Sequence, residues 1–168
     1  MPISASFADL WKNYPSDDEY PFEELYKELG WDDLIGKPEW RNTCAVRVHI
    51  SLLRSGIHVP GRVKVKKDGL GIKDLLIEPG QKALADQLKS PKFLGDPQKI
   101  TAANKDAKLK DKTGVISFFG IPGYMVDGRP GGHIDLVKYG EILWFWSTLE
   151  CRLDCYWAAK EIWFWPIN

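Results

Sequence analysis

Hydrophobic residues recur every three or four positions through the first half of the chain, the spacing of amphipathic helices. The predicted helices cover residues 6–14, residues 21–29, the segment from Asn42 or Thr43 to Gly56, and residues 81–90. Pro15 and Gly30 mark the ends of the first two. The apolar face of the third helix is wider than a single stripe. We therefore expect that helix to be buried against a sheet.

From Gly114 onward the pattern changes to the alternation and turn density of β-structure. The predicted strands cover residues 115–119, 133–138, 141–146 and 161–165. Both faces of segment 141–146 are apolar, with Trp144 and Trp146 on one and Leu143 and Phe145 on the other, which predicts an interior strand. Residues 69–71 are expected in a hairpin or surface loop, and residues 91–111 in an irregular covering loop.

Helices followed by antiparallel strands indicate an α+β fold. The length of 168 residues fits one domain over residues 1–168. Acidic and basic residues balance at 23 each, so no overall field favours nucleic acid or an anionic membrane. The N-terminus lacks a basic segment followed by a long apolar stretch, and no apolar run reaches the about 20 residues that span a bilayer. We expect export, if any, to use a route other than a cleaved leader.

The chain has three cysteines, one isolated and two close together. An odd count with one close pair favours a disulfide between Cys151 and Cys155 and a free thiol at Cys44. The alternative is three reduced thiols packed as small hydrophobic side chains.

Cys44 stands where the third predicted helix begins. The partial positive charge of a helix N-terminus favours a thiolate, and the first N–H groups can stabilise an oxyanion. A thiolate also needs a histidine that later gives its proton to the leaving amine. His49 lies on the same helix and points elsewhere, and His58 follows in a loop. His133, at the start of a predicted strand and after two glycines, is therefore the candidate partner.

Four motifs together carry a resemblance to a known family. They are residues 42–47 (Asn-Thr-Cys-Ala-Val-Arg), 132–136 (Gly-His-Ile-Asp-Leu), 154–157 (Asp-Cys-Tyr-Trp) and 161–165 (Glu-Ile-Trp-Phe-Trp). In this order the chain resembles the fourth family of type VI secretion amidase effectors. The resemblance implies a papain-like fold of the NlpC type and a peptidoglycan amidase that cleaves the bond between D-glutamate and meso-diaminopimelate. It further implies delivery into the periplasm of rival bacteria, a dedicated immunity protein as partner, and no metal or other cofactor.

The same resemblance implies a Cys-His-Asp triad, with Cys44 as nucleophile and His133 as base. Asp154 matches the acid by its place beside the second cysteine of the close pair, and a Cys151–Cys155 bridge would hold its loop. Asp135 is the alternative, although two residues along the same strand it is expected to be held away from the imidazole edge. In either case the acid accepts from the imidazole N–H and fixes its tautomer.

Three other functions compete with this one. A zinc site of His133, Cys151 and Cys155 lacks a recognisable fourth ligand. A non-catalytic cell-wall binding module would use the tryptophans as a platform, yet most of the eight lie at core spacing. A secreted lysin would share the fold and chemistry without any link to type VI secretion.

Overall fold

The computed structural model describes residues 4–126, 128–139, 141–142 and 153–168. Its centre is a five-stranded antiparallel sheet in the order β3-β9-β4-β7-β8. The strands are β3 (Gln98–Lys99), β4 (Thr113–Phe119), β7 (His133–Lys138), β8 (Glu141–Ile142) and β9 (Glu161–Pro166). Three of the four predicted strands, at 115–119, 133–138 and 161–165, are thus confirmed within about two residues of their ends. The predicted interior strand at 141–146 lies mostly outside the described residues.

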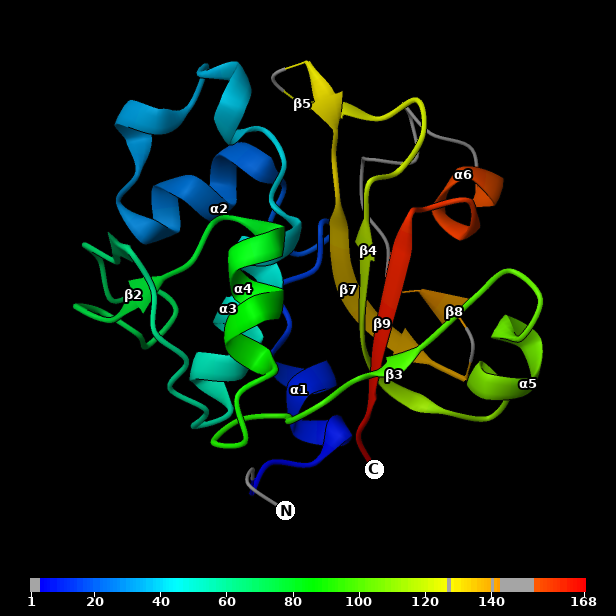
Figure 1. The fold of residues 1–168 in the computed structure, drawn as a ribbon. Helices are drawn as coiled ribbons and strands as arrows, with labels where there is room; N and C mark the ends of the chain where they lie inside the picture. The colour runs from blue at the N-terminus through cyan, green and yellow to red at the C-terminus, as the bar shows by residue number, and fades with distance from the viewer. Residues whose placement is uncertain (1–3, 127, 140, 143–152) are drawn as a thin grey trace.

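Helices cover both faces of this sheet, and the N-terminal helices occupy one side of it (Figure 1). They are α1 (Phe7–Asn13), α2 (Phe22–Leu29), α3 (Cys44–Arg54) and α4 (Gln81–Leu88), all in segments where the sequence predicts helices. Short 3-10 turns at Asp32–Leu34 and Pro38–Trp40 connect α2 to α3. The architecture is α+β, as predicted from the order of the segments. No helix in the described part of the chain is long and apolar enough to cross a membrane.

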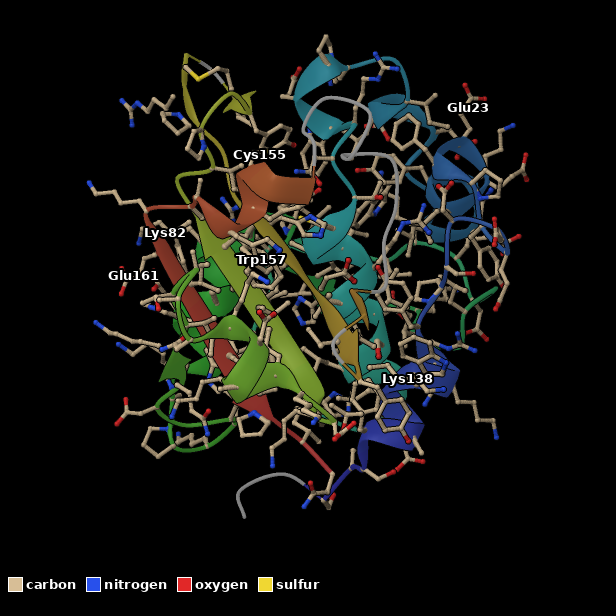
Figure 2. All side chains as sticks on the ribbon, turned by 90° about the vertical axis from the view of Figure 1, so that its right-hand side faces the viewer. Glu23, Lys82, Lys138, Cys155, Trp157 and Glu161 are labelled. Atoms are coloured by element: carbon tan, nitrogen blue, oxygen red, sulfur yellow. The ribbon has the colours of Figure 1, made fainter. Side chains whose placement is uncertain are left out.

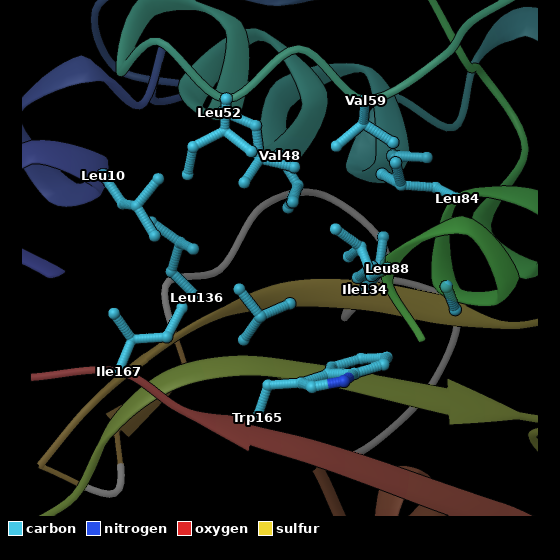
Figure 3. Close-up of a cluster of buried hydrophobic side chains, with 14 of the residues drawn as sticks. Leu10, Val48, Leu52, Val59, Leu84, Leu88, Ile134, Leu136, Trp165 and Ile167 are labelled. Atoms are coloured by element: carbon cyan, nitrogen blue, oxygen red, sulfur yellow. The ribbon is translucent and has the colours of Figure 1, made fainter. Parts of the chain in front are cut away.

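Helix α3 lies between two hydrophobic clusters and is buried from Cys44 to Leu53. Its Val48 and Leu52 pack with Ile134 and Leu136 of β7 and with Trp165 of β9, as Figure 3 shows. Val46, Ile50 and Leu53 pack instead against α2 and against the small hairpin of β1 (Val63–Lys64) and β2 (Leu76–Ile77). The loop of this hairpin contains residues 69–71, as the sequence predicts. An amphipathic helix has one buried face, whereas α3 contacts apolar side chains on both sides.

The second face of the sheet is covered by α5 (Lys105–Leu109) and α6 (Leu153–Trp157). Trp157 of α6 lies edge-on to Phe118 of β4 at 5.4 Å, and Lys105 Nζ of α5 lies 5.2 Å from the Trp157 ring centre (Figure 2). The expectation of an irregular loop over residues 91–111 is therefore wrong in part, because β3 and α5 lie within it. Both elements are short, and two exposed strand residues give no alternation for the sequence to reveal.

His49 of α3 is fully buried and serves the fold. Its Nε2 donates to the Val59 carbonyl at 2.9 Å, and its Nδ1 accepts from the Glu78 backbone N–H at 2.7 Å. His49 is therefore the neutral tautomer with its proton on Nε2, and both ring nitrogens have a hydrogen-bond partner. Burial lowers the pKa of His49 to about 4, against the opposing effects of the Val59 hydrogen bond and the Glu78 charge. Protonation would remove the acceptor that holds the Glu78 N–H.

We expect His49 to make the stability of the protein fall as the pH drops. In the unfolded chain a histidine binds its proton near pH 6.5, whereas folded His49 binds one only near pH 4. Its contribution is therefore complete above pH 6.5 and is lost as the pH falls through about 4, an effect on the order of 3 kcal/mol. Urea unfolding of wild type and His49→Gln between pH 4 and 7 checks this. The stability advantage of the wild type should shrink toward pH 4, and a constant difference would contradict the assignment.

Candidate functional site

Cys44 is the first residue of α3 and is a free, buried thiol. Thr43 takes the N-cap position, but its hydroxyl accepts from Arg47 Nε at 2.9 Å and makes no side-chain cap. Asn42 is the residue that binds the helix start, because its Oδ1 accepts from the Cys44 backbone N–H at 3.1 Å. The predicted helix N-terminus at Cys44 is confirmed, and of the two predicted capping side chains Asn42 makes the hydrogen bond.

His133 is the first residue of β7 and is 2% exposed. It pairs with Phe118 of β4, and its ring lies 5.1 Å from the ring of Tyr156 on α6. The preceding residue, Gly132, lies where β4 and α4 come very close to its backbone. A Cβ at this position would lie 1.9 Å from Gln81 Oε1 of α4 and 2.7 Å from the Phe118 carbonyl oxygen. Only a glycine fits this position without displacing its neighbours.

Asp135 lies directly behind His133 on the same face of β7, because side chains two positions apart in a strand point to the same side. His133 Nε2 lies 3.0 Å from Asp135 Oδ2. The other oxygen, Oδ1, accepts from the Leu136 N–H at 2.9 Å and from the Tyr14 hydroxyl at 3.4 Å. The expectation that strand geometry holds Asp135 away from the imidazole edge is therefore wrong. One strand carries both the imidazole and a fully buried carboxylate that contacts it.

The remaining predicted site residues lie near α6. The backbone of Asp154 belongs to α6, but its side chain lies outside the described residues, so its role stays a prediction. Cys151 also lies outside the described residues, and the predicted bridge to Cys155 stays a prediction as well. His58 is exposed on the loop after α3. Within the described part of the chain, no group of three or more His, Cys, Asp or Glu side chains is arranged to hold a metal ion.

The protonation of His133 is governed by its two polar neighbours. Burial alone would lower the pKa of His133, but the hydrogen bond with Asp135 and the proximity of Asp135 and Cys44 raise it to about 9. Burial raises the pKa of Asp135 above its usual range, while hydrogen bonds from His133, the Leu136 N–H and Tyr14 act in the opposite direction. An imidazolium that is stable at neutral pH between a thiol and a carboxylate is an acid poised to protonate a leaving group.

Arg47 lies one turn after Cys44 on α3 and is completely buried. It adds a permanent positive charge close to the site. Its guanidinium donates to the Pro15 carbonyl at 2.7 Å and to Asp17 Oδ1 at 3.3 Å. Burial lowers the pKa of Arg47, and the nearby Tyr14 and Asp17 raise it again. The arginine therefore ties the segment after α1 to α3, close to the tyrosine that contacts Asp135. Arg47 ends the Asn-Thr-Cys-Ala-Val-Arg motif, but its burial and its partners have no signature in a single sequence.

The architecture is that of a papain-like α+β domain, with a thiol at the start of a buried helix and an imidazole on the adjacent strand of an antiparallel sheet. The chain belongs to the family described as type VI secretion system (T6SS), amidase effector protein 4, whose family model matches residues 40–165. The match covers Cys44, His133 and Asp135, whereas Tyr14 lies outside it.

Solved structures with the same fold are known. The effector Tae4 from Enterobacter cloacae, in its complex with Tai4, is 19% identical with a TM-score of 0.73, and the alignment covers 99% of this chain and 100% of that one. The Tae4 of the Tae4/Tai4 effector–immunity system from Salmonella typhimurium is 14% identical with a TM-score of 0.73, over 99% and 100% of the two chains. At these identities the likeness concerns the fold. A comparison with curated proteins gave no match.

We expect Gly132→Ala to destabilise the protein, because the new methyl group meets the Phe118 backbone as well as a side chain. Overpacking of this kind costs about 1–3 kcal/mol, measurable by urea unfolding. Gly69→Ala is a matched control, since its methyl group would meet only the carboxylate end of the Glu28 side chain, which can move aside. Equal stability of the two variants would contradict the close approach at Gly132.

Proposed function

We propose that this protein is an antibacterial peptidoglycan amidase that works as a cysteine hydrolase, with Cys44 as the nucleophile and His133 as the general acid and base. The observation that carries the proposal is the buried His133, whose Nε2 contacts Asp135 Oδ2 at 3.0 Å, on a strand that packs against the helix begun by the free thiol of Cys44. A histidine held between a thiol and a carboxylate is the arrangement that nucleophilic catalysis by cysteine requires. Family membership supplies the amidase activity.

The reaction follows from these positions in two halves. The Cys44 thiolate attacks the carbonyl carbon of the scissile amide, and a C–S bond forms as the carbonyl oxygen becomes an oxyanion. His133 then donates its proton to the amide nitrogen, so the C–N bond breaks and the amine leaves. In the second half His133 takes a proton from water, whose oxygen attacks the thioester carbonyl. The C–S bond breaks, and the thiolate–imidazolium pair is restored.

A carboxylate behind His133 would hold its tautomer and stabilise the imidazolium. Asp135 is our choice for this role, because it contacts Nε2 and is fixed on its other oxygen by the Leu136 N–H and the Tyr14 hydroxyl. Asp154, predicted from the resemblance, is the competing carboxylate. With Nε2 directed to Asp135, the proton exchanged with Cys44 would be carried on Nδ1.

The substrate and setting come from the family resemblance. We propose that the enzyme hydrolyses the D-glutamyl–meso-diaminopimelate bond of cell-wall peptides in the periplasm of target bacteria, and that the producing cell protects itself with an immunity protein. Two observations support the partner. The solved structures with this fold include effector–immunity complexes of Tae4 and Tai4 from Enterobacter cloacae and Salmonella typhimurium, and their alignments span nearly the whole of this chain.

Replacing Cys44 with Ala should abolish the release of soluble muropeptides from purified sacculi, because the thiolate that forms the acyl-enzyme is lost. His133→Gln should lower kcat by about three orders of magnitude or more, since the general acid is lost. Mass spectrometry of the released fragments identifies the bond that is cut. Undiminished release by Cys44→Ala would sink the proposal, and binding of wild type to sacculi without any release would favour the binding module instead.

The same assay separates the two candidate acids through a matched pair of variants. Asp135→Asn should lower kcat by about 10²–10⁴-fold, because the amide can favour the wrong imidazole tautomer. Asp154→Asn should have a much smaller effect. The reverse order of the two losses would assign the orienting role to Asp154.

A further inference from the structure

One hydrogen bond joins the loop before the nucleophile to the turn that follows β4. Asn42, two residues before Cys44, donates from Nδ2 to the Tyr124 hydroxyl at 2.5 Å. Its other amide atom, Oδ1, accepts from the Cys44 N–H at 3.1 Å. Since a backbone N–H can only donate, the orientation of the Asn42 amide is fixed at Oδ1, and Nδ2 must face the tyrosine.

Tyr124 is rigidly attached to the beginning of β7. It lies in the turn after β4, where its carbonyl accepts from the Gly131 N–H, and it is 4% exposed. A Cβ on Gly131 would lie 2.6 Å from the Tyr124 ring, so the ring is pressed against the backbone two residues before His133. The Gly131 carbonyl accepts in turn from the Ile121 N–H at 2.8 Å. Tyr124 is therefore held against the segment just before β7 both by its carbonyl and by its ring.

We propose that Asn42 and Tyr124 are positioning residues that fix the distance between Cys44 and His133. The two reacting side chains belong to opposite layers of the domain, Cys44 to the helical layer and His133 to the sheet. Hydrophobic packing holds the layers together but is non-directional, whereas a short hydrogen bond between two half-fixed groups sets both a distance and a direction. The Asn42 amide spans the boundary, because its Oδ1 accepts from the residue that attacks and its Nδ2 donates to a tyrosine that is hydrogen-bonded to the segment just before β7.

This role rests on the proposed cysteine hydrolase mechanism and adds residues to it that touch neither the substrate nor the reacting atoms. A misplacement of about 1 Å between reacting groups can cost about 10²-fold in rate. Loss of the Asn42–Tyr124 bond should therefore lower kcat while leaving the substrate contacts, and so KM, nearly unchanged. Loss of a merely stabilising contact would lower the melting temperature without this selective effect on kcat.

Tyr124→Phe is the decisive variant, because it removes only the hydroxyl and keeps the ring that packs on Gly131. With a soluble muropeptide as substrate we expect kcat to fall about ten- to a hundredfold and KM to change less than twofold. Alkylation of Cys44 by iodoacetamide at pH 6, followed by mass spectrometry of the Cys44 peptide, should slow about tenfold, because the thiol pairs less well with His133. An unchanged kcat and alkylation rate would overturn the proposal.

Tyr26→Phe provides the matched control. The Tyr26 hydroxyl also makes a 2.5 Å hydrogen bond, to the Trp40 carbonyl, but both of these residues belong to the helical layer. Tyr26→Phe should be destabilised to a similar degree but keep the wild-type kcat and the wild-type alkylation rate of Cys44. Equal losses of kcat in Tyr26→Phe and Tyr124→Phe would overturn the positioning role. Asn42→Ala should lower kcat further in wild type than in the Tyr124→Phe background, and additive losses would contradict a shared bond. The alkylation rate needs no turnover, so its outcome stands even if Cys44→Ala shows the proposed hydrolase activity to be wrong.

Discussion

Helix α3 is buried from Cys44 to Leu53, and the two layers of the domain meet on it. One side of the helix packs on β7 and β9, and the other packs on α2 and the β1–β2 hairpin. A helix held on both sides cannot rotate or slide without opening one of the two clusters, because interiors are packed as densely as crystals of small molecules. The position of Cys44 relative to the sheet thus depends on the packing of the whole helix, and the Asn42–Tyr124 hydrogen bond acts on top of that packing.

The same burial puts charged groups where water cannot screen them. Arg47, His133 and Asp135 are each at most 2% exposed, and each has polar partners at hydrogen-bond distance. Burying an ion is costly unless it is paired, so these contacts are needed for folding as well as for the site. They also explain why His133 and His49 behave differently in one small protein. Burial lowers the pKa of His49, which faces two backbone groups, whereas carboxylate and thiol neighbours raise the pKa of His133.

Much of this arrangement is readable from the sequence, because periodicity and helix-start chemistry are local. The alternation around residues 115, 134 and 163 locates the three central strands, and the Asn-Thr-Cys segment locates the start of α3. Contacts between distant segments leave no such trace. The two-residue period of a strand places Asp135 and His133 on the same face of β7, but whether the two side chains meet depends on their rotamers. The Asn42–Tyr124 contact joins residues 82 positions apart, and the Tyr14–Asp135 contact joins residues 121 positions apart. Neither contact can be predicted from the local sequence around its residues.

The central claim is that His133 is a stable imidazolium between Cys44 and a carboxylate. The direct measurement is the ¹⁵N chemical shift of its two ring nitrogens between pH 5 and pH 10 in the wild type and in Cys44→Ala. With a pKa raised to about 9 by its neighbours, the ring should carry both protons at pH 7.5 and lose one near pH 9. Removal of the thiol should lower that midpoint, since one of the two neighbours that raise it is gone. A ring that is already neutral at pH 7.5 in the wild type, with the same titration in Cys44→Ala, would contradict the account.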